Sequence, residues 1–322
     1  MTEPLLHAEH LRKRFDGGIL AVDDVSLTVR PGETVGIVGE SGCGKSTTAK
    51  LLLRLLRPDA GTVRFAGHDL GALRGRELRA LRAQLQLVPQ HPQSAFNPRM
   101  SIGDSIAFNL QVHGTGRGPA RARARDLLER VGVPGAHAAK RPHELSGGQL
   151  QRAAIARAIA TEPRLVVCDE AVSALDKSVQ AQVLNLLDEL QRETGVAFLF
   201  ISHDLAVVEH VSDRVVVMYL GRVVEEGPAR ELWETPAHPY TSALLSATPD
   251  RMADRVRLTG EPPSPGNPPS GCCFRTRCPV ALDACAGERP PLVTHAPGRT
   301  AACVRLDALP AGDDRPLVAA GR

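Results

Sequence analysis

Residues 39–47 read GESGCGKST, and this stretch decides the fold more than any other in the chain. It fits the pattern G-x-x-x-x-G-K-[ST], follows a strand-like apolar run and precedes a helix-like run at residues 45–56 that Pro58 stops. That context indicates a phosphate-binding loop, because glycines let backbone N–H groups approach phosphate oxygens closely. A glycine-rich turn before an ordinary helix is the alternative. The stretch predicts an α/β fold that binds a nucleoside triphosphate.

The phosphate loop (residues 39–47) also predicts which side chains meet the ligand. Lys45 is expected to reach the β- and γ-phosphates, and the hydroxyl of Ser46 is expected to coordinate Mg²⁺. The helix that starts here presents its positive N-terminal end to the same anions. Further nucleotide-binding residues are expected at Gly39, Ser41, Gly42, Gly44 and Thr47.

A second stretch, LVVCDE at residues 165–170, places two carboxylates after an apolar run. Short, fully apolar runs are typical of strands buried on both faces of a parallel sheet. At the end of such a strand Asp169 can hold Mg²⁺ through water, and Glu170 can act as general base for an attacking water. A solvated strand end without chemistry is the alternative.

The remaining pattern predicts an α/β fold with a mixed, mainly parallel sheet and a helical insertion. Strands are expected around the phosphate loop and at residues 62–65, 86–88, 198–202 and 214–226. Helices are expected at residues 117–130, 149–160 and 179–192. We assign residues 1–247 to this domain with the insertion at about 92–162, residues 248–306 to a proline-rich linker and cysteine-containing C-terminal extension, and residues 307–322 to a disordered tail.

Composition narrows the class of function. The chain has 322 residues, 43% of them hydrophobic, a net charge of +3 and 3% aromatic residues. The small charge and the scarcity of stacking rings argue against a partner that is a nucleic acid. No apolar run approaches the roughly 18 residues needed to span a bilayer, and the N-terminal residues lack a signal-peptide layout. We expect a cytosolic protein whose membrane role comes through a partner.

The seven cysteines are unevenly placed along the chain. Cys43 and Cys168 lie inside the two nucleotide motifs, where small side chains fill space. The other five crowd the last sixth of the chain, and in a cytosolic protein such a cluster favours metal over disulfides. Cys273 adjoins the first of four cysteines that are spaced C-x5-C-x6-C-x17-C. It is therefore ambiguous which of the two adjacent cysteines would be the first ligand. The four candidate ligands are Cys272, Cys278, Cys285 and Cys303.

Between the two nucleotide motifs stands LSGGQ, at residues 145–149. A phosphate loop, LSGGQ and an apolar strand ending in Asp-Glu, in that order, resemble the ATPase subunit of an ABC (ATP-binding cassette) protein. The resemblance implies a P-loop NTPase fold with a helical signature subdomain, and ATP hydrolysis with Mg²⁺ by a head-to-tail dimer. A kinase would share the phosphate loop but not LSGGQ. A repair-type ATPase or a two-cassette translation protein is a further, non-transport alternative.

The resemblance assigns further residues to the site. It implies that His203 contacts the γ-phosphate and that Gln90 reaches the metal and the water. It implies that Phe15 stacks on adenine, with core packing as the alternative. LSGGQ and residues 173–176 would act across the dimer, on the other subunit's ATP. The residues implied to act in trans are Ser146, Gly147, Gly148, Gln149 and Asp176.

Four stretches narrow the resemblance to the second type of ATPase subunit in bacterial oligopeptide and dipeptide importers. That group implies a second ABC ATPase in a homo- or heterodimer, two membrane permeases and an extracytoplasmic substrate-binding protein, at the cytoplasmic face of the membrane. The helical insertion would receive the permeases. Nickel or another peptide-like solute is the alternative cargo. The stretches are SAFNPRMSI (residues 94–102), CDEAVSALDKSVQAQVLNLL (168–187), HPYTSALLSA (238–247) and EPPSPGNPPSGCCFRTRCP (261–279).

Departures from the group are small and touch no catalytic position: Phe96, Lys177 and the extra Cys273. Some relatives in the group carry a four-iron four-sulfur cluster. The resemblance therefore favours such a cluster on the four spaced cysteines, with zinc or reduced, unliganded cysteines as the alternatives.

Overall fold

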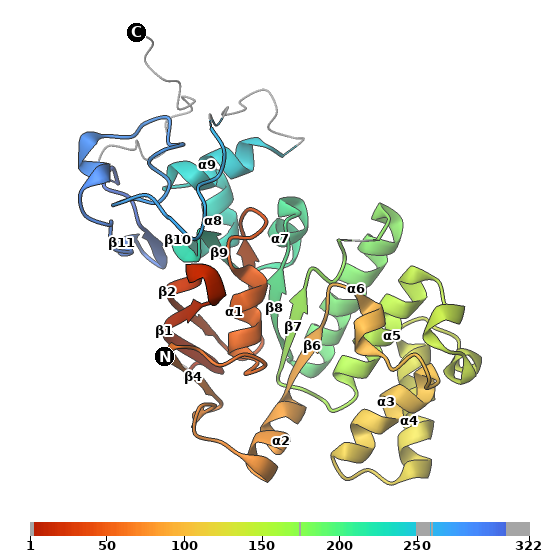
Figure 1. Cartoon of the computed structure of the whole chain (residues 1–322). Helices are drawn as coiled ribbons and strands as arrows, with labels where there is room; N and C mark the ends of the chain where they lie inside the picture. The colour runs from red at the N-terminus through yellow and green to blue at the C-terminus, as the bar shows by residue number, and fades with distance from the viewer. Residues whose placement is uncertain (1–2, 174, 249–257, 259, 307–322) are drawn as a thin grey trace.

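An eight-stranded mixed sheet runs through the centre of the molecule, in the order β11-β12-β10-β9-β3-β8-β7-β6 (Figure 1). The computed structural model describes residues 3–173, 175–248, 258 and 260–306. The strands from β9 to β6 pair in parallel, and β10, β12 and β11 continue the sheet antiparallel. The bounds are β3 (Thr34–Val38), β6 (Leu85–Val88), β7 (Leu165–Asp169), β8 (Ala197–Ile201), β9 (Arg214–Tyr219), β10 (Arg222–Pro228), β11 (Val293–Ala296) and β12 (Arg299–Ala301).

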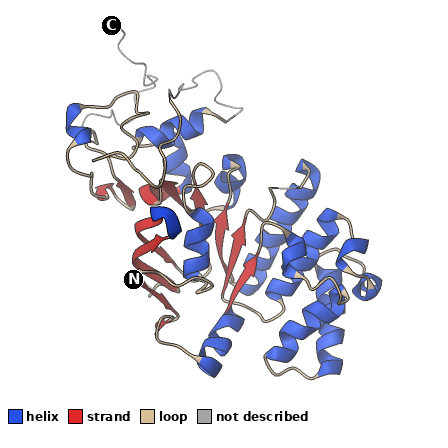
Figure 2. Cartoon of the chain, in the orientation of Figure 1, coloured by secondary structure: helices blue, strands red, loops and turns tan. Residues whose placement is uncertain are grey.

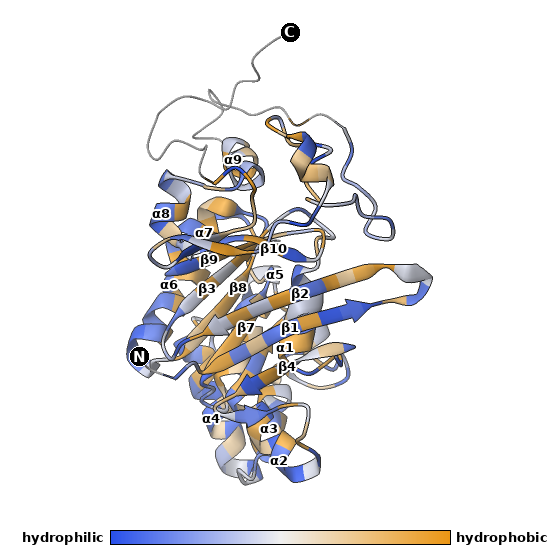
Figure 3. Ribbon diagram, turned by 90° about the vertical axis from the view of Figure 1, so that its left-hand side faces the viewer, coloured by the Kyte–Doolittle hydropathy of each residue, from blue (hydrophilic) through white to orange (hydrophobic). Residues whose placement is uncertain are grey.

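The central strands are buried on both faces, as their apolar runs predict. On β7, Val166 lies in the core cluster beneath the helices, whereas its neighbour Val167 lies in the cluster on the opposite face. On β8, Phe198 and Leu199 divide in the same way. Figure 3 shows the hydrophobic colour along these strands. Since successive side chains of a strand point to opposite faces, a strand covered on both sides needs an unbroken apolar sequence.

A smaller antiparallel sheet, in the order β2-β1-β4-β5, covers one face together with α1 (Lys45–Leu52). Its inner residues share a core cluster with those of β3, β7 and β8. This layer holds the phosphate loop against the main sheet from outside. Its strands are β1 (Leu6–Arg14), β2 (Leu20–Val29), β4 (Ala60–Phe65) and β5 (His68–Asp69).

Helix α1 ends at Leu52, four residues before the end that the apolar run predicts. Arg54 adopts a φ of 50°, in the left-handed region, and a residue in that conformation does not continue a right-handed helix. The prediction of a helix over residues 45–56 is therefore wrong for its last turn, where Leu55 is 59% exposed, whereas Leu51, Leu52 and Leu53 are buried.

A group of helices forms the side of the molecule next to β6 and β7 (Figure 2). The arginine-rich α4 buries only Ala120, Ala124, Leu127 and Leu128 and exposes its arginines, as its sequence predicts for a solvated helix. Short single-turn helices connect the group. Its main helices are α3 (Ile102–Val112), α4 (Arg117–Arg130) and α5 (Gly147–Ile159).

The other helices pack along the main sheet or next to it. Helix α6 (Lys177–Thr194) has an amphipathic sequence, and its buried side chains join the same core as the helical group. The remaining helices are α2 (Gly75–Gln84), α7 (Leu205–Val211), α8 (Ala229–Glu234) and α9 (Pro239–Ser246). Within the described residues, no helix is both long and apolar enough to cross a membrane.

The C-terminal segment (residues 260–306) adds β11 and β12 to the edge of the main sheet, where Glu225 and Glu226 of β10 pair with Ala301 and Thr300. Sequence patterns did not reveal these two short strands. Phe274 anchors the segment in a third core cluster, with its ring 5.4 Å from the rings of both Tyr219 and Tyr240. The tail expected at residues 307–322 lies outside the described residues, as does part of the linker.

Removing the Phe274 ring should test whether this segment is part of the folded core. The substitution Phe274→Ala leaves a cavity in a fully buried position, and we expect the free energy of unfolding to fall by about 3–5 kcal/mol. Trp233, the chain's single tryptophan, lies in the same cluster and makes urea unfolding visible by fluorescence.

The matched control is Leu292→Ala, in the same segment but 41% exposed, which should change the free energy by no more than about 0.5 kcal/mol. An unfolding midpoint for Phe274→Ala equal to that of the control would show that the segment contributes nothing to the fold.

Candidate active site

The candidate site residues follow the carboxyl ends of four neighbouring parallel strands. The phosphate loop follows β3, Gln90 follows β6, Asp169 and Glu170 end β7, and His203 follows β8. In open α/β sheets ligands bind outside the carboxyl ends of the strands. The sheet order therefore gathers at one edge residues that are more than a hundred positions apart in sequence.

Glycines fix the path of the phosphate loop. A Cβ at Gly39, where φ is 148°, would lie 2.2 Å from the carbonyl oxygen of Met218. A Cβ at Gly44, where φ is 105°, would lie 2.2 Å from that of Ala21. At Gly42, near the exposed end of the loop beside Ser41, the position of a Cβ has nothing within 4 Å. The loop is thus held closely on its inner side and is open outside.

The N-terminus of α1 suits an anion. The first N–H groups of a helix have no partner within it, and Gly44 at the N-cap supplies no side-chain hydrogen bond. The ammonium of Lys45 lies across the loop, where it donates to the carbonyl oxygens of Gly39 at 2.7 Å and Glu40 at 3.0 Å. Thr47 follows in the first turn and is half-buried. These donors and this charge fit a polyphosphate.

A pair of oxygen-bearing side chains lies beside Lys45. The hydroxyl of Ser46 donates to Oδ1 of Asp169 at 2.9 Å. Burial raises the pKa of Asp169, and the hydrogen bond from Ser46 and the charge of Lys45 oppose that rise. Hydroxyl and carboxylate oxygens are the ligands that Mg²⁺ prefers. This donor set fits the metal that the sequence predicts here.

The side chain of Glu170 contacts two further candidate residues, Gln90 and His203. Nε2 of Gln90 donates to one of its carboxylate oxygens at 2.5 Å, and Nδ1 of His203 lies 3.5 Å from the other. Its side chain is 17% exposed, and its backbone has a φ of 49°, unusual for a residue other than glycine. Strained conformations of this kind cluster at functional sites. The structure thus brings together Gln90, Glu170 and His203.

Phe15 lies between β1 and the helical turn at Asp16–Gly18, with 42% of its surface exposed. It belongs to none of the three core clusters of the described residues. Core packing therefore does not account for this ring, which stays available for contact with a base.

The LSGGQ residues form the start of α5, in the helical group and apart from α1 (Figure 1). Ser146 caps the helix by accepting from the N–H of Gln149, whose side chain accepts from the N–H of Ser146. Gly147 starts the helix, and a Cβ at Gly148 would lie 2.9 Å from the side chain of Val179.

Asp176 lies beside this loop, because it caps α6 by accepting from the N–H of Val179 at 2.9 Å. Among the described residues, no hydrogen bond or ion pair joins Asp176 or the LSGGQ residues to Lys45, Asp169 or Glu170. The residues predicted to act in trans form a second, separate surface.

Four cysteine side chains line one small cavity in the C-terminal segment: Cys272, Cys278, Cys285 and Cys303. All seven cysteines are free thiols. Burial raises the pKa of Cys278 to about 11, and the neighbouring thiols add to the rise. Cys273 does not line the cavity, so the structure resolves which of the two adjacent cysteines faces the other three. No set of three or more His, Cys, Asp or Glu side chains in the described part of the chain is arranged to hold a single metal ion.

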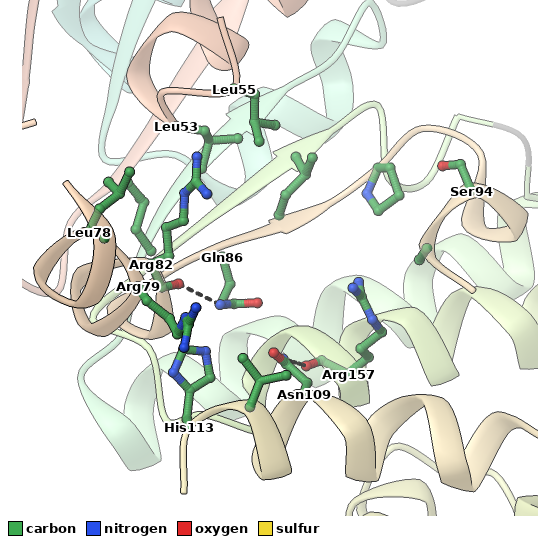
Figure 4. Close-up of a pocket in the computed structure, with 16 residues that line it drawn as sticks. Leu53, Leu55, Leu78, Arg79, Arg82, Gln86, Ser94, Asn109, His113 and Arg157 are labelled. Carbon is green, nitrogen blue, oxygen red and sulfur yellow. Dashed lines mark hydrogen bonds between the residues drawn. The ribbon is translucent and has the colours of Figure 1, made fainter. Parts of the chain in front are cut away.

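A groove of about 730 Å³ separates α2 and β6 from α3 and α5 (Figure 4). Apolar side chains line it together with Arg79, Arg82, His113 and Arg157, and no carboxylate is among the described residues of its lining. Burial lowers the pKa of Arg157, and no hydrogen bond from its guanidinium to another described residue is present. Sequence reasoning placed a partner surface on the helical insertion but did not identify this groove.

Sequence reasoning also missed Arg277, which forms an ion pair with Glu40 of the phosphate loop at 2.9 Å. The two residues are 237 positions apart, and no local pattern could have paired them.

Comparisons with known proteins cover most of the chain. Residues 22–173 match the family model for the ABC transporter, and residues 224–285 match that for the oligopeptide/dipeptide transporter C-terminal region. The second match includes three of the four cysteines that line the cavity.

Curated relatives match over nearly their whole length. A probable peptide ABC transporter ATP-binding protein of Sinorhizobium fredii is 51% identical, over 94% of this chain and 90% of its own. The oligopeptide transport ATP-binding protein OppF of Salmonella typhimurium is 49% identical, over 90% of this chain and 89% of its own.

Solved structures match the cassette part of the chain. A dimeric ATP-binding cassette in a post-hydrolysis state, bound to ADP and Pi, is 28% identical with a TM-score of 0.65, over 70% of this chain and 99% of its own. CbiO1 from Clostridium perfringens, part of an ABC transporter complex, is 26% identical with a TM-score of 0.64, over 78% of this chain and 98% of its own.

Proposed function

The chain belongs to the family of ATP-binding proteins of peptide ABC transporters, ATPases that couple ATP hydrolysis to transport, and from this premise we propose how its residues perform that work. The observation that carries the proposal is the convergence of Ser46, Asp169, Gln90, Glu170 and His203 at the edge of the sheet beside the phosphate loop.

The phosphate loop and α1 bind the triphosphate of ATP. The free N–H groups at the start of α1 and the ammonium of Lys45 meet the phosphate oxygens, and Phe15 stacks on the adenine. Ser46, Asp169 and Gln90 would hold Mg²⁺, which would neutralise charge on the phosphates when bound there.

Glu170 is the general base. Its side chain is largely shielded from solvent and lies next to the residues proposed to hold Mg²⁺, where a water in line with the γ-phosphate can give it a proton. Gln90 and His203 hold that carboxylate from both sides, and His203 extends toward the γ-phosphate. A proton acceptor fixed in this way is oriented before the reaction starts.

A second ATPase subunit completes each site. Ser146, Gly147, Gly148 and Gln149 lie on a surface separate from their own chain's phosphate loop, with Asp176 beside them. Another helix N-terminus thus offers N–H groups to an anion that this chain does not hold. Head-to-tail pairing of two cassettes brings that surface to the γ-phosphate, in a homodimer or a heterodimer. ATP closes the pair, and hydrolysis opens it.

Two membrane permeases receive this motion at the groove between α2, β6, α3 and α5 (Figure 4). Strand β6 forms one wall of the groove, and Gln90 follows β6. The same stretch of chain therefore links the groove to the ATP site. The chain thereby acts at the cytoplasmic face of a membrane, and a substrate-binding protein outside delivers the cargo. The peptide transport named for the relatives supports peptide as cargo rather than nickel.

The four-cysteine cavity is proposed to hold a four-iron four-sulfur cluster. Four thiols from separate turns face one space, which suits a cluster with one thiolate per iron. A single zinc ion needs four sulfurs at about 2.3 Å from it, and the described residues are not arranged in that way. Bound there, a cluster would tie the turns of the segment together.

The substitution Glu170→Gln tests the proposed hydrolysis. It removes the proton acceptor and keeps the size of the side chain, so ATP binding should persist while turnover falls by at least about a hundredfold. Phosphate release and equilibrium binding of radiolabelled ATP measure the two effects separately. Glu231→Gln, an exposed position on α8, is the control and should hydrolyse like the parent chain. Unchanged turnover in Glu170→Gln would contradict the assignment of the base.

Arg157→Gln tests the groove. It removes the half-buried charge and should weaken co-purification with the permeases in detergent, with ATP binding by the isolated chain unchanged. Arg79→Glu, at the exposed rim of the same groove, should do the same. Arg117→Glu on α4 is the control, because that arginine is exposed outside the groove. Normal recovery of permeases with both groove variants would place the docking surface elsewhere.

Iron and acid-labile sulfide in protein purified without oxygen test the cysteine cavity. We expect both in the parent chain and in Cys273→Ser, and neither in Cys285→Ser. Zinc without sulfide would assign the cavity to zinc. Protein that contains none of the three would show that these thiols are unliganded.

A further inference from the structure

Among the described residues, the side chain of Arg277 joins the C-terminal segment to the phosphate loop by an ion pair. Nη1 of Arg277 lies 2.9 Å from Oε2 of Glu40, the second residue of the loop, and 3.4 Å from the hydroxyl oxygen of Tyr219. The side chain of Arg277 is 8% exposed and that of Glu40 is 29% exposed. The hydrogen bond to Glu40 raises the pKa of Arg277, so the guanidinium keeps its charge. A charge-assisted bond with this little exposure is stronger than one on an open surface.

Glu40 is held at three points. Its carboxylate accepts from Arg277, its N–H donates to the hydroxyl oxygen of Tyr240 at 2.8 Å, and its carbonyl oxygen accepts from the ammonium of Lys45 at 3.0 Å. Lys45 is the side chain assigned to the phosphates. Arg277 therefore fixes the residue that orients both the loop backbone and the lysine within it.

Aromatic packing fixes Arg277 in turn. Phe274, three residues earlier, is fully buried against Tyr219 and Tyr240, whose ring centroids lie 4.6 Å apart. Tyr219 bonds Arg277 and Tyr240 bonds Glu40, so the same cluster supports both partners of the ion pair. The packing of Phe274 and the hydrogen bond to Tyr219 both restrain Arg277, so the position of the guanidinium is a property of the fold rather than of one flexible side chain.

We propose that Arg277 is a positioning residue for ATP binding, which holds the phosphate loop in its binding conformation through Glu40. The C-terminal segment is then part of the nucleotide site, although it contributes no atom to the phosphates. The proposal rests on the proposed function, because it concerns the affinity of the loop for ATP. It assigns to the segment a role that is separate from the cargo and from the cysteine cavity.

Equilibrium binding of radiolabelled ATP to the full chain tests the proposal, with Arg277→Gln, Arg277→Lys, Glu40→Gln and the double variant Arg277→Gln/Glu40→Gln. We expect each Gln variant to lower ATP affinity by about tenfold, the order expected for loss of one charge-assisted hydrogen bond. The double variant should lose no more than either single variant, since both remove the same contact. Arg277→Lys should recover part of the affinity because it restores the charge.

The matched control is Arg275→Gln, two residues away in the same segment. Arg275 donates to the carbonyl oxygen of Ser270 and does not contact the loop. This variant should bind ATP like the parent chain. If Arg277→Gln does not fold, Glu40→Gln leaves the C-terminal segment intact and must by itself show the loss of affinity.

Parent-like affinity in Glu40→Gln and Arg277→Gln would overturn the proposal while leaving the ATPase assignment in place. Additive losses in the double variant would also overturn it, since Arg277 would then act by another route. A parent chain that fails to bind ATP would overturn the proposed function itself. Thermal unfolding without nucleotide separates a loss of fold from a loss of affinity. A purely structural role for Arg277 would lower the Tm of Arg277→Lys as well as that of Arg277→Gln.

Discussion

The parallel pairing of β3 with β8, of β8 with β7 and of β7 with β6 is the constraint on which the rest of the structure depends. Parallel neighbours present their carboxyl ends at one edge, so each strand delivers one component to the same place. The phosphate loop, Asp169 with Glu170, and Gln90 meet only because the strands that carry them are adjacent. Exchanging two strands in this order would separate the groups while leaving every motif in the sequence intact.

The same pairing dictates the packing. Parallel strands require crossover connections, and here these connections supply α1, the helical group and α6 as covers for the two faces. The helical group lines one side of the groove, and it also carries the LSGGQ loop at the start of α5. Under the proposed function these two surfaces bind other chains, and the chemistry of the cassette then depends on assembly.

Much of the fold followed from the sequence, because its signals are local. The unbroken apolar runs of β7 and β8, the glycine pattern of the phosphate loop and the amphipathic α6 all gave the elements that the structure contains. The mixed α/β fold, the ABC family and the transport-coupled ATPase are confirmed by the comparisons. The roles of individual site residues stay predictions, although the structure joins Ser46 to Asp169, and Gln90 and His203 to Glu170.

The features that the sequence did not predict depend on single backbone conformations or on contacts between distant residues, not on local sequence patterns. The end of α1 depends on the single backbone conformation of Arg54, which an apolar run does not encode. Strands β11 and β12 are too short and too polar to be predicted from their sequence. They form because β12 pairs with the edge of β10. The ion pair that links Arg277 to Glu40 connects distant positions, and only the folded chain defines such a contact.

The separation of Glu40 and Arg277 in the sequence determines when their contact can form during synthesis of the chain. A ribosome completes the phosphate loop early but adds Arg277 only 237 residues later, which at about 5–20 residues per second takes roughly 10–50 s. During that interval Glu40 lacks Arg277 as its partner. Strand β3 cannot pair with β8 and β9 until those strands have also been synthesised. The nascent chain therefore carries its nucleotide motif long before it carries the arginine that pairs with Glu40.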